Sequence, residues 1–183
     1  MIIEEIGSSL TFEFDNSSWT YLMKYDSDAQ NKQVDYDKLK NAIEGTKAVD
    51  FIGIFQNNQL NLIEVKNYKF NPIDSDHDII AEIAQKVRDT MAGIIGGSRH
   101  STHQKEYWHH HLQYLINPSK DVRIILWLED DRPLDKRLKT RNSNYLTTLK
   151  KKLSWLTSNV KISNIADNDF GEALKVTNLP RTK

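Results

Sequence analysis

Three charged residues lie inside or beside apolar segments of the chain, where burying charge is costly. Asp50 lies at the start of the segment 49–55, and Glu64 and Lys66 flank Val65 at the end of the segment 60–65. Side chains alternate along a strand, so Glu64 and Lys66 share one face. Two converging carboxylates with a backbone carbonyl between them suit Mg²⁺, and a nearby lysine could orient or deprotonate water or stabilise phosphoryl charge. The chemistry predicted is phosphodiester hydrolysis.

This prediction depends on how the two segments pair in a hairpin. An odd-numbered loop centred on Asn57 sets Asp50 opposite Glu64, and all three charged side chains then converge on one face. A two-residue turn at Asn57 and Asn58 would instead set Asp50 opposite Val65 and separate the carboxylates.

A purely structural interpretation is also open. Glu64 and Lys66 could form an ion pair on an exposed edge strand, a contact that contributes about 0–1 kcal/mol. Such a pair would have no chemical role.

The periodicity of apolar residues predicts a single domain of mixed helices and strands over residues 1–183. Residues 10–14 and 19–25 are expected to form an N-terminal β-hairpin, making residues 1–30 an extension of the domain. Helices are expected at 35–44, 76–95, 104–116 and 144–156, with Gly96 and Gly97 ending the second. Strands are expected at 49–55, 60–65, 122–128 and 160–165. The order indicates an α/β fold with one sheet.

Composition narrows the classes of function. The 183 residues include no cysteine, which excludes disulfides, thiolate metal sites and cysteine nucleophiles. No apolar run could cross a bilayer and the N-terminus lacks the basic residues of a signal peptide, so no membrane association and a cytoplasmic location are expected. The chain is formally neutral, but residues 1–45 hold nine acids against four bases and residues 131–161 nine bases against two acids.

The spacing of the three charged residues resembles a known superfamily. Asp50, thirteen residues and then Glu64-Val65-Lys66 are similar to the D…(D/E)xK signature of the PD-(D/E)XK nucleases, and the resemblance covers about residues 35–165. It implies a restriction-endonuclease-like fold, with a mixed central β-sheet flanked by helices, and cleavage of DNA or RNA with Mg²⁺ or Mn²⁺. Asp50, Glu64 and the Val65 carbonyl would be the metal ligands, and Lys66 the catalytic base or charge stabiliser.

Two parts of the family pattern are less clear in this chain. Val49 replaces the proline that often precedes the first acid, a common departure. Many members add an acid from the first helix, and five acids could supply it here: Glu44, Asp26, Asp28, Asp35 and Asp37. Some members also place a glutamine or lysine on the helix after the lysine strand, and Gln85-Lys86 is the matching place here. Gln85 is the catalytic candidate, and a position on a solvated helix face is its alternative.

A second class of function is a catalytically silent module of the same fold that binds a partner protein or nucleic acid within a larger assembly. The neutral net charge favours it, because a nonspecific nuclease usually has a stronger basic field. A homodimer would be expected if both strands of a duplex were cut symmetrically. Lys150, Lys151 and Lys152 could follow a phosphate backbone or simply be solvated. The cluster His109, His110 and His111 is expected on the surface.

Overall fold

The computed structural model describes residues 1–26, 33–69, 78–130, 132 and 136–179. Its strands form two sheets. The five-stranded sheet has the order β3 (Trp19–Lys24), β4 (Phe51–Phe55), β5 (Gln59–Asn67), β6 (Asp121–Glu129) and β7 (Val160–Ser163). The three-stranded sheet has the order β1 (Ile2–Glu5), β2 (Leu10–Phe14) and β8 (Leu174–Asn178). The first sheet is mixed, since β3, β4 and β5 pair antiparallel and β5, β6 and β7 pair parallel.

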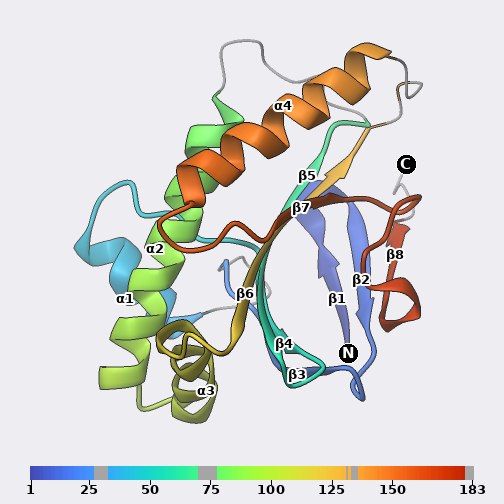
Figure 1. The fold of residues 1–183 in the computed structure, drawn as a ribbon. Coiled ribbons are helices and arrows are strands. Elements are labelled where there is room, and N and C mark those ends of the chain that lie inside the picture. Colours follow the sequence, from blue (N-terminus) through green and yellow to red (C-terminus); the bar gives the residue numbers. More distant parts are fainter. Residues whose placement is uncertain (27–32, 70–77, 131, 133–135, 180–183) are drawn as a thin grey trace.

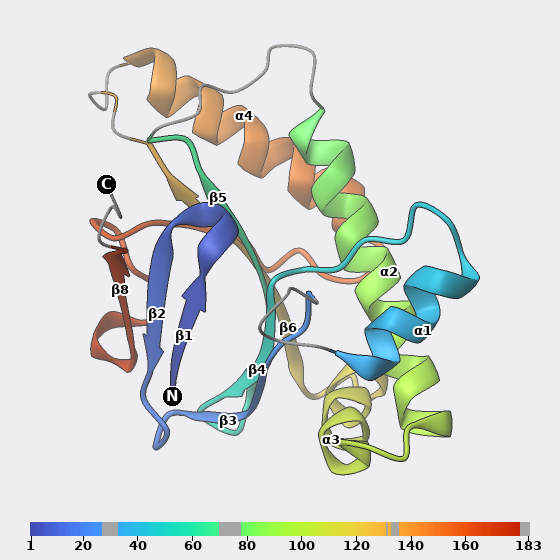
Figure 2. The same cartoon turned by 180° about the vertical axis from the view of Figure 1, so that it is seen from behind.

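The helices and the small sheet cover opposite faces of the five-stranded sheet (Figure 1). The helices are α1 (Val34–Ala42), α2 (Ile79–His100), α3 (Lys105–Ile116) and α4 (Lys136–Leu153). Figure 2 shows the same layers from behind. The α/β class and the mixed sheet are thus confirmed, but the strands form two sheets and not the one expected. In the described part of the chain, the α-helices cover only one face of the larger sheet (Figure 1).

Alternation along the strands divides the core into two apolar clusters. Ile52, Leu62 and Leu126 point to the helical face, while Ile63 and Trp127 point to the small sheet. Strands buried on both faces need near-continuous apolar residues, which explains why β4 and β6 contain so few polar ones. A charged side chain on the helical face of β5 therefore lies between the sheet and a helix.

An N-terminal hairpin is present, but it joins β1 and β2 and is not the one expected. β2 pairs with β1 and β8, whereas β3 joins β4 in the larger sheet, so the predicted pairing of 10–14 with 19–25 is wrong. The intervening turn is closed by Asp15, whose carboxylate accepts hydrogen bonds from the hydroxyls of Ser17 and Ser18. The turn sends Phe14 and Trp19 into the apolar cluster between the sheets, where their rings pack edge to face.

Two helix boundaries differ from those expected. α2 continues through Gly96 and Gly97 to His100, because Gly97 serves packing rather than termination: a Cβ there would lie 2.7 Å from the ring of Trp108. α4 begins at Lys136, eight residues earlier than expected, in a segment rich in good helix formers but poor in apolar ones. In the described part of the chain, no helix is long and apolar enough to cross a membrane.

A bulge in β3 explains why one histidine of the expected surface cluster is buried. The register between β3 and β4 shifts between Thr20 and Met23, and Tyr21 adopts a φ of 49°. The carbonyl of Tyr21 accepts a hydrogen bond of 2.7 Å from Nε2 of His111, which is fully buried. Burial lowers the pKa of His111 to about 4 despite this bond, because protonation would add an Nδ1 proton at a buried atom.

We expect His111 to make the fold sensitive to acid. The folded pKa lies below the ordinary value of 6.5, so this contribution to stability is present above pH 6.5 and is lost as the pH falls towards 4. Between pH 7.5 and 5, the free energy of unfolding of the wild type should fall by about 2 kcal/mol more than that of His111→Gln. The glutamine amide can donate to the same carbonyl, so the variant keeps the hydrogen bond. Urea unfolding at both pH values measures this, and equal losses would contradict the role of His111.

Candidate active site

Asp50 lies directly before β4 and is held there by its own hydrogen bonds and by one of its neighbour Val49. Its carbonyl accepts a hydrogen bond of 2.8 Å from the N–H of Tyr25, and its carboxylate accepts one of 2.6 Å from the N–H of Val65 in β5. The preceding N–H, that of Val49, donates to the hydroxyl of Thr90 in α2. Asp50 is only 6% exposed, so its position is defined by the sheet and the helix together.

The register of the hairpin is the one that brings the carboxylates together. Phe51 pairs with Ile63 and Phe55 with Gln59, which leaves a three-residue loop centred on Asn57. Continued by one residue, this register sets Asp50 opposite Glu64. The prediction of an odd-numbered loop is confirmed.

Glu64 is the centre of a charged cluster on the helical face of the sheet. Its Oε1 lies 3.1 Å from Nζ of Lys66 and 2.8 Å from Nζ of Lys86, which reaches it from α2. Lys66 also contacts Glu82 at 3.2 Å. Glu64 and Lys66 therefore do form an ion pair, but Glu64 is 1% exposed and belongs to a buried network, not to an exposed edge.

Burial makes the two carboxylates poor anions in the metal-free protein. The pKa of Asp50 is raised well above its ordinary value by burial and then by repulsion from Glu64, although Lys86 opposes the shift. Burial also raises the pKa of Glu64, and this rise is limited by Lys86 and Lys66. The site is thus short of positive charge near Asp50.

The two lysines remain protonated. Burial alone would lower the pKa of each, but the neighbouring carboxylates outweigh burial and raise both. For Lys66 the main carboxylates are Glu64 and Glu82, and for Lys86 they are Glu64 and Asp50. An ammonium group with a raised pKa stabilises negative charge and is a poor general base.

The oxygens of this cluster fit a hard divalent cation. Within the described residues, Oε2 of Glu64 is buried and accepts no hydrogen bond. The N–H of Val65 points towards Asp50, and since both backbone groups of a strand residue point to the same side, its carbonyl does too. No group of three or more histidine, aspartate or glutamate side chains suited to a metal occurs in that part of the chain. The ligands available are Asp50, Glu64 and the Val65 carbonyl, and a Mg²⁺ ion would complete its shell with water.

Gln85 is directed away from this cluster. Its amide donates to the carbonyl of Gly45 at 2.7 Å and to the carboxylate of Asp89 at 3.4 Å. Adjacent side chains on a helix differ in direction by about 100°, so it is Lys86 that reaches Glu64.

The five acids considered for the first helix have different surroundings. Asp35 accepts hydrogen bonds from Ser101 and Trp108, so it has a structural role. Asp26 interacts electrostatically with the cluster: burial raises its pKa, and the charge of Lys86 acts against that rise. Glu44 is exposed, Asp37 lies in the first turn of α1, and Asp28 falls outside the described residues.

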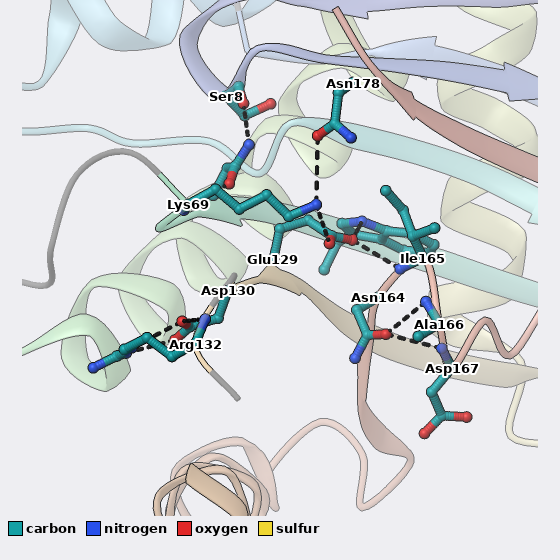
Figure 3. A network of polar contacts seen from close by, with 12 residues as sticks. Ser8, Lys69, Glu129, Asp130, Arg132, Asn164, Ile165, Ala166, Asp167 and Asn178 are labelled. Carbon is teal, nitrogen blue, oxygen red and sulfur yellow. Dashed lines mark hydrogen bonds and ion pairs between the residues drawn. The ribbon is translucent and has the colours of Figure 1, made fainter. Parts of the chain in front are cut away.

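A separate polar network anchors the end of β5 on the opposite face (Figure 3). Glu129 accepts hydrogen bonds from the indole of Trp127 and the N–H of Ile165, and pairs with Lys69 at 3.1 Å. The amide of Asn67 donates to the carbonyl of Ser8 in the N-terminal segment. Both oxygens of Glu129 are used, so this buried acid fixes the strand that holds Glu64 and Lys66 and is no candidate ligand.

Glu82 and Glu129 were not among the predicted site residues, and Lys86 was named only as the neighbour of the catalytic candidate Gln85. Glu82 and Lys86 are four residues apart in α2 and occupy one helix face, which is a detectable signal for a charged helix facing a charged strand. Glu129 ends an apolar strand and gave no such signal.

Comparison with known proteins finds no relative of this chain. No family model, no curated protein and no solved structure matches the chain. The functional argument therefore depends on the geometry of the cluster.

Proposed function

We propose that the protein is a metal-dependent nuclease of the restriction-endonuclease-like class, which hydrolyses phosphodiester bonds of DNA or RNA with Mg²⁺ or Mn²⁺. The observation that carries this proposal is the buried Oε2 of Glu64 beside Asp50, which accepts no hydrogen bond from the described residues, with Lys66 at 3.1 Å from the other oxygen. Two carboxylates buried this deeply are costly to a fold unless a cation compensates them.

Each group then has a distinct task. A bound divalent ion would supply Lewis-acid stabilisation of the charge on the phosphate. Asp50, Glu64 and the Val65 carbonyl would hold it, and the N–H of Val65 orients the Asp50 carboxylate. The ammonium of Lys66, which is 21% exposed, can contact the scissile phosphate and neutralise its developing charge. Lys86 is a positioning residue that holds Glu64.

The test is titration of Mn²⁺ into the wild type and into the double variant Asp50→Ala and Glu64→Ala, with a cleavage assay on mixed DNA and RNA. Asp121→Asn is a suitable control, because Asp121 is exposed at the opposite end of the sheet. Saturable binding and cleavage that are lost only in the double variant, while its far-UV circular dichroism remains that of the folded protein, support the proposal. Absence of metal binding by the wild type would refute it.

Lys66→Met should abolish cleavage while leaving Mn²⁺ binding largely intact, because Lys66 contacts Glu64 but is not a ligand. Removing one group that stabilises transition-state charge costs about 10²–10³ in rate. Single-turnover cleavage and calorimetric Mn²⁺ titration measure the two effects, with the exposed Lys161→Met as control. Cleavage within threefold of the wild type would exclude a catalytic role for Lys66.

A second candidate is a non-catalytic module of the same fold. It is favoured by the ion pairs of Glu64 with Lys66 and Lys86, which compensate one buried carboxylate without any metal. Its signature is nucleic-acid or protein binding that Asp50→Ala and Glu64→Ala leave unchanged.

A further inference from the structure

α4 is the most unbalanced element of a neutral chain. Its 18 residues include no acid and seven bases: Lys136, Arg137, Lys139, Arg141, Lys150, Lys151 and Lys152. All but the half-buried Arg141 are exposed. Six exposed cations on one helix form a local positive field that net neutrality conceals.

One flank of α4 is hollowed into an open groove of about 530 Å³. The groove is lined by Lys136, Arg137, Thr140, Arg141, Asn144 and Tyr145. These residues follow one another in steps of four, and at about 100° per residue the same flank continues to Lys151 and Lys152. Lys139 and Lys150 lie on the other flank, across the buried stripe of Leu138, Leu149 and Leu153.

This flank adjoins the candidate active site. Tyr68, two residues beyond Lys66, packs with Tyr145 against the same apolar cluster. Burial raises the pKa of Tyr68, and the charges of Lys66 and Arg141 lie close enough to oppose that rise. The groove therefore opens beside the end of β5 that carries Lys66.

The lining of the groove consists of groups that bind phosphate. Guanidinium and ammonium groups and the Asn144 amide can donate hydrogen bonds, and Arg141 covers the ring of Tyr145 at 5.5 Å. Asp130 is an acid that contacts this set: it pairs with Arg141 at 3.1 Å and with Arg132, and so fixes one guanidinium at the edge of the groove.

We infer that this groove and its continuation to Lys152 bind the phosphodiester backbone of a nucleic-acid strand and lead it to Lys66. The inference rests on the proposed nuclease function. Lys136 and Lys152 are about 24 Å apart along the helix axis, which matches about seven base steps at 3.4 Å each. DNA and RNA strands share the chemistry that this surface recognises, and the experiment separates them.

The test compares two charge reversals on the same helix. Arg137→Glu with Lys151→Glu alters the groove flank, and Lys139→Glu with Lys150→Glu makes the same change of charge on the other flank. Binding of labelled 20-nucleotide single-stranded DNA, single-stranded RNA and duplex DNA is measured by fluorescence anisotropy in EDTA, where metal-dependent cleavage cannot occur. We expect the groove pair to weaken the preferred probe at least tenfold and the control pair less than threefold. The groove pair should also reduce the salt slope by about 1.4 to 1.8, as expected for two lost phosphate contacts.

An equal loss of probe affinity in the groove pair and the control pair of substitutions would overturn the inference, as would a wild type that binds none of the probes. A Mn²⁺ cleavage assay separates it from the proposed function, because the groove pair should raise KM and leave kcat unchanged. If the wild type does not cleave but the two pairs of substitutions still differ in probe binding, the nuclease proposal is contradicted and the groove is retained as a nucleic-acid-binding surface. If cleavage requires Asp50 but the groove pair and the control pair of substitutions have the same KM, the role of the groove is contradicted and the nuclease proposal is retained.

Discussion

Asp50→Asn should abolish metal-dependent cleavage and yet leave the metal-free protein at least as stable as the wild type. Activity is lost because the substitution removes one of the two carboxylates that would hold the metal ion. Without the ion the transition state loses a few kcal/mol of stabilisation, which lowers the cleavage rate roughly 100-fold or more. Stability should be preserved because the asparagine carbonyl can still accept the bond of 2.6 Å from the N–H of Val65. Its amide can also donate to Glu64, where the carboxylate of Asp50 is repelled.

The same substitution should change how stability depends on pH. Burial and Glu64 raise the pKa of Asp50 well above 3.8 in the folded state, so the folded protein binds this proton more tightly than the unfolded chain. The contribution of Asp50 is therefore fully present below pH 3.8 and is lost as the pH rises through the folded pKa. The free energy of unfolding of Asp50→Asn, minus that of the wild type, should grow from pH 4 upward in EDTA.

Urea unfolding with and without Mn²⁺ measures both effects. Added Mn²⁺ should stabilise the wild type and have little effect on Asp50→Asn, because an ion that binds only the folded state stabilises it by an amount that rises with the logarithm of its affinity. Asp121→Asn controls for loss of a carboxylate elsewhere in the sheet. A stability difference that does not vary with pH would show that the pKa of Asp50 is not raised in the folded protein.

The core of the candidate site could be predicted because its geometry is local. Strand alternation sets Glu64 and Lys66 on one face, and a three-residue loop centred on Asn57 brings Asp50 opposite Glu64. Both follow from residues fewer than twenty apart. The strand periodicities likewise predicted all five strands of the larger sheet to within a few residues.

The remaining features depend on contacts between distant segments or on small rotations. β2 pairs with β8, more than 150 residues away, and no local pattern records this pairing. Gln85 and Lys86 differ by one position, and the docking of α2 decides which of them reaches Glu64. The burial of His111 likewise follows from a bulge in β3, which frees the carbonyl of Tyr21.

Glu64→Leu should destabilise the fold by about 3–5 kcal/mol, the usual cost of removing one partner from a buried ion pair. Glu64 is 1% exposed and neutralises Lys86, whose side chain is 12% exposed and cannot readily turn to water. Lys66 is 21% exposed and keeps its ion pair with Glu82. Most of the lost stability should therefore come from Lys86, which is left buried without Glu64.

Adding Lys86→Met should therefore restore much of the lost stability, because apolar residues often replace a buried ion pair without net cost. The exposed pair Glu172 and Lys175, 3.5 Å apart, is the matched control, and Glu172→Leu with Lys175→Met should show a coupling of at most about 1 kcal/mol. Urea unfolding of both double-mutant cycles gives the two coupling energies. Were Glu64→Leu to cost less than the control substitution, Glu64 would not be the centre of the network. A large coupling at Lys86 would mean that the fold tolerates this glutamate only with a cation beside it, which is the property that a metal-binding carboxylate needs.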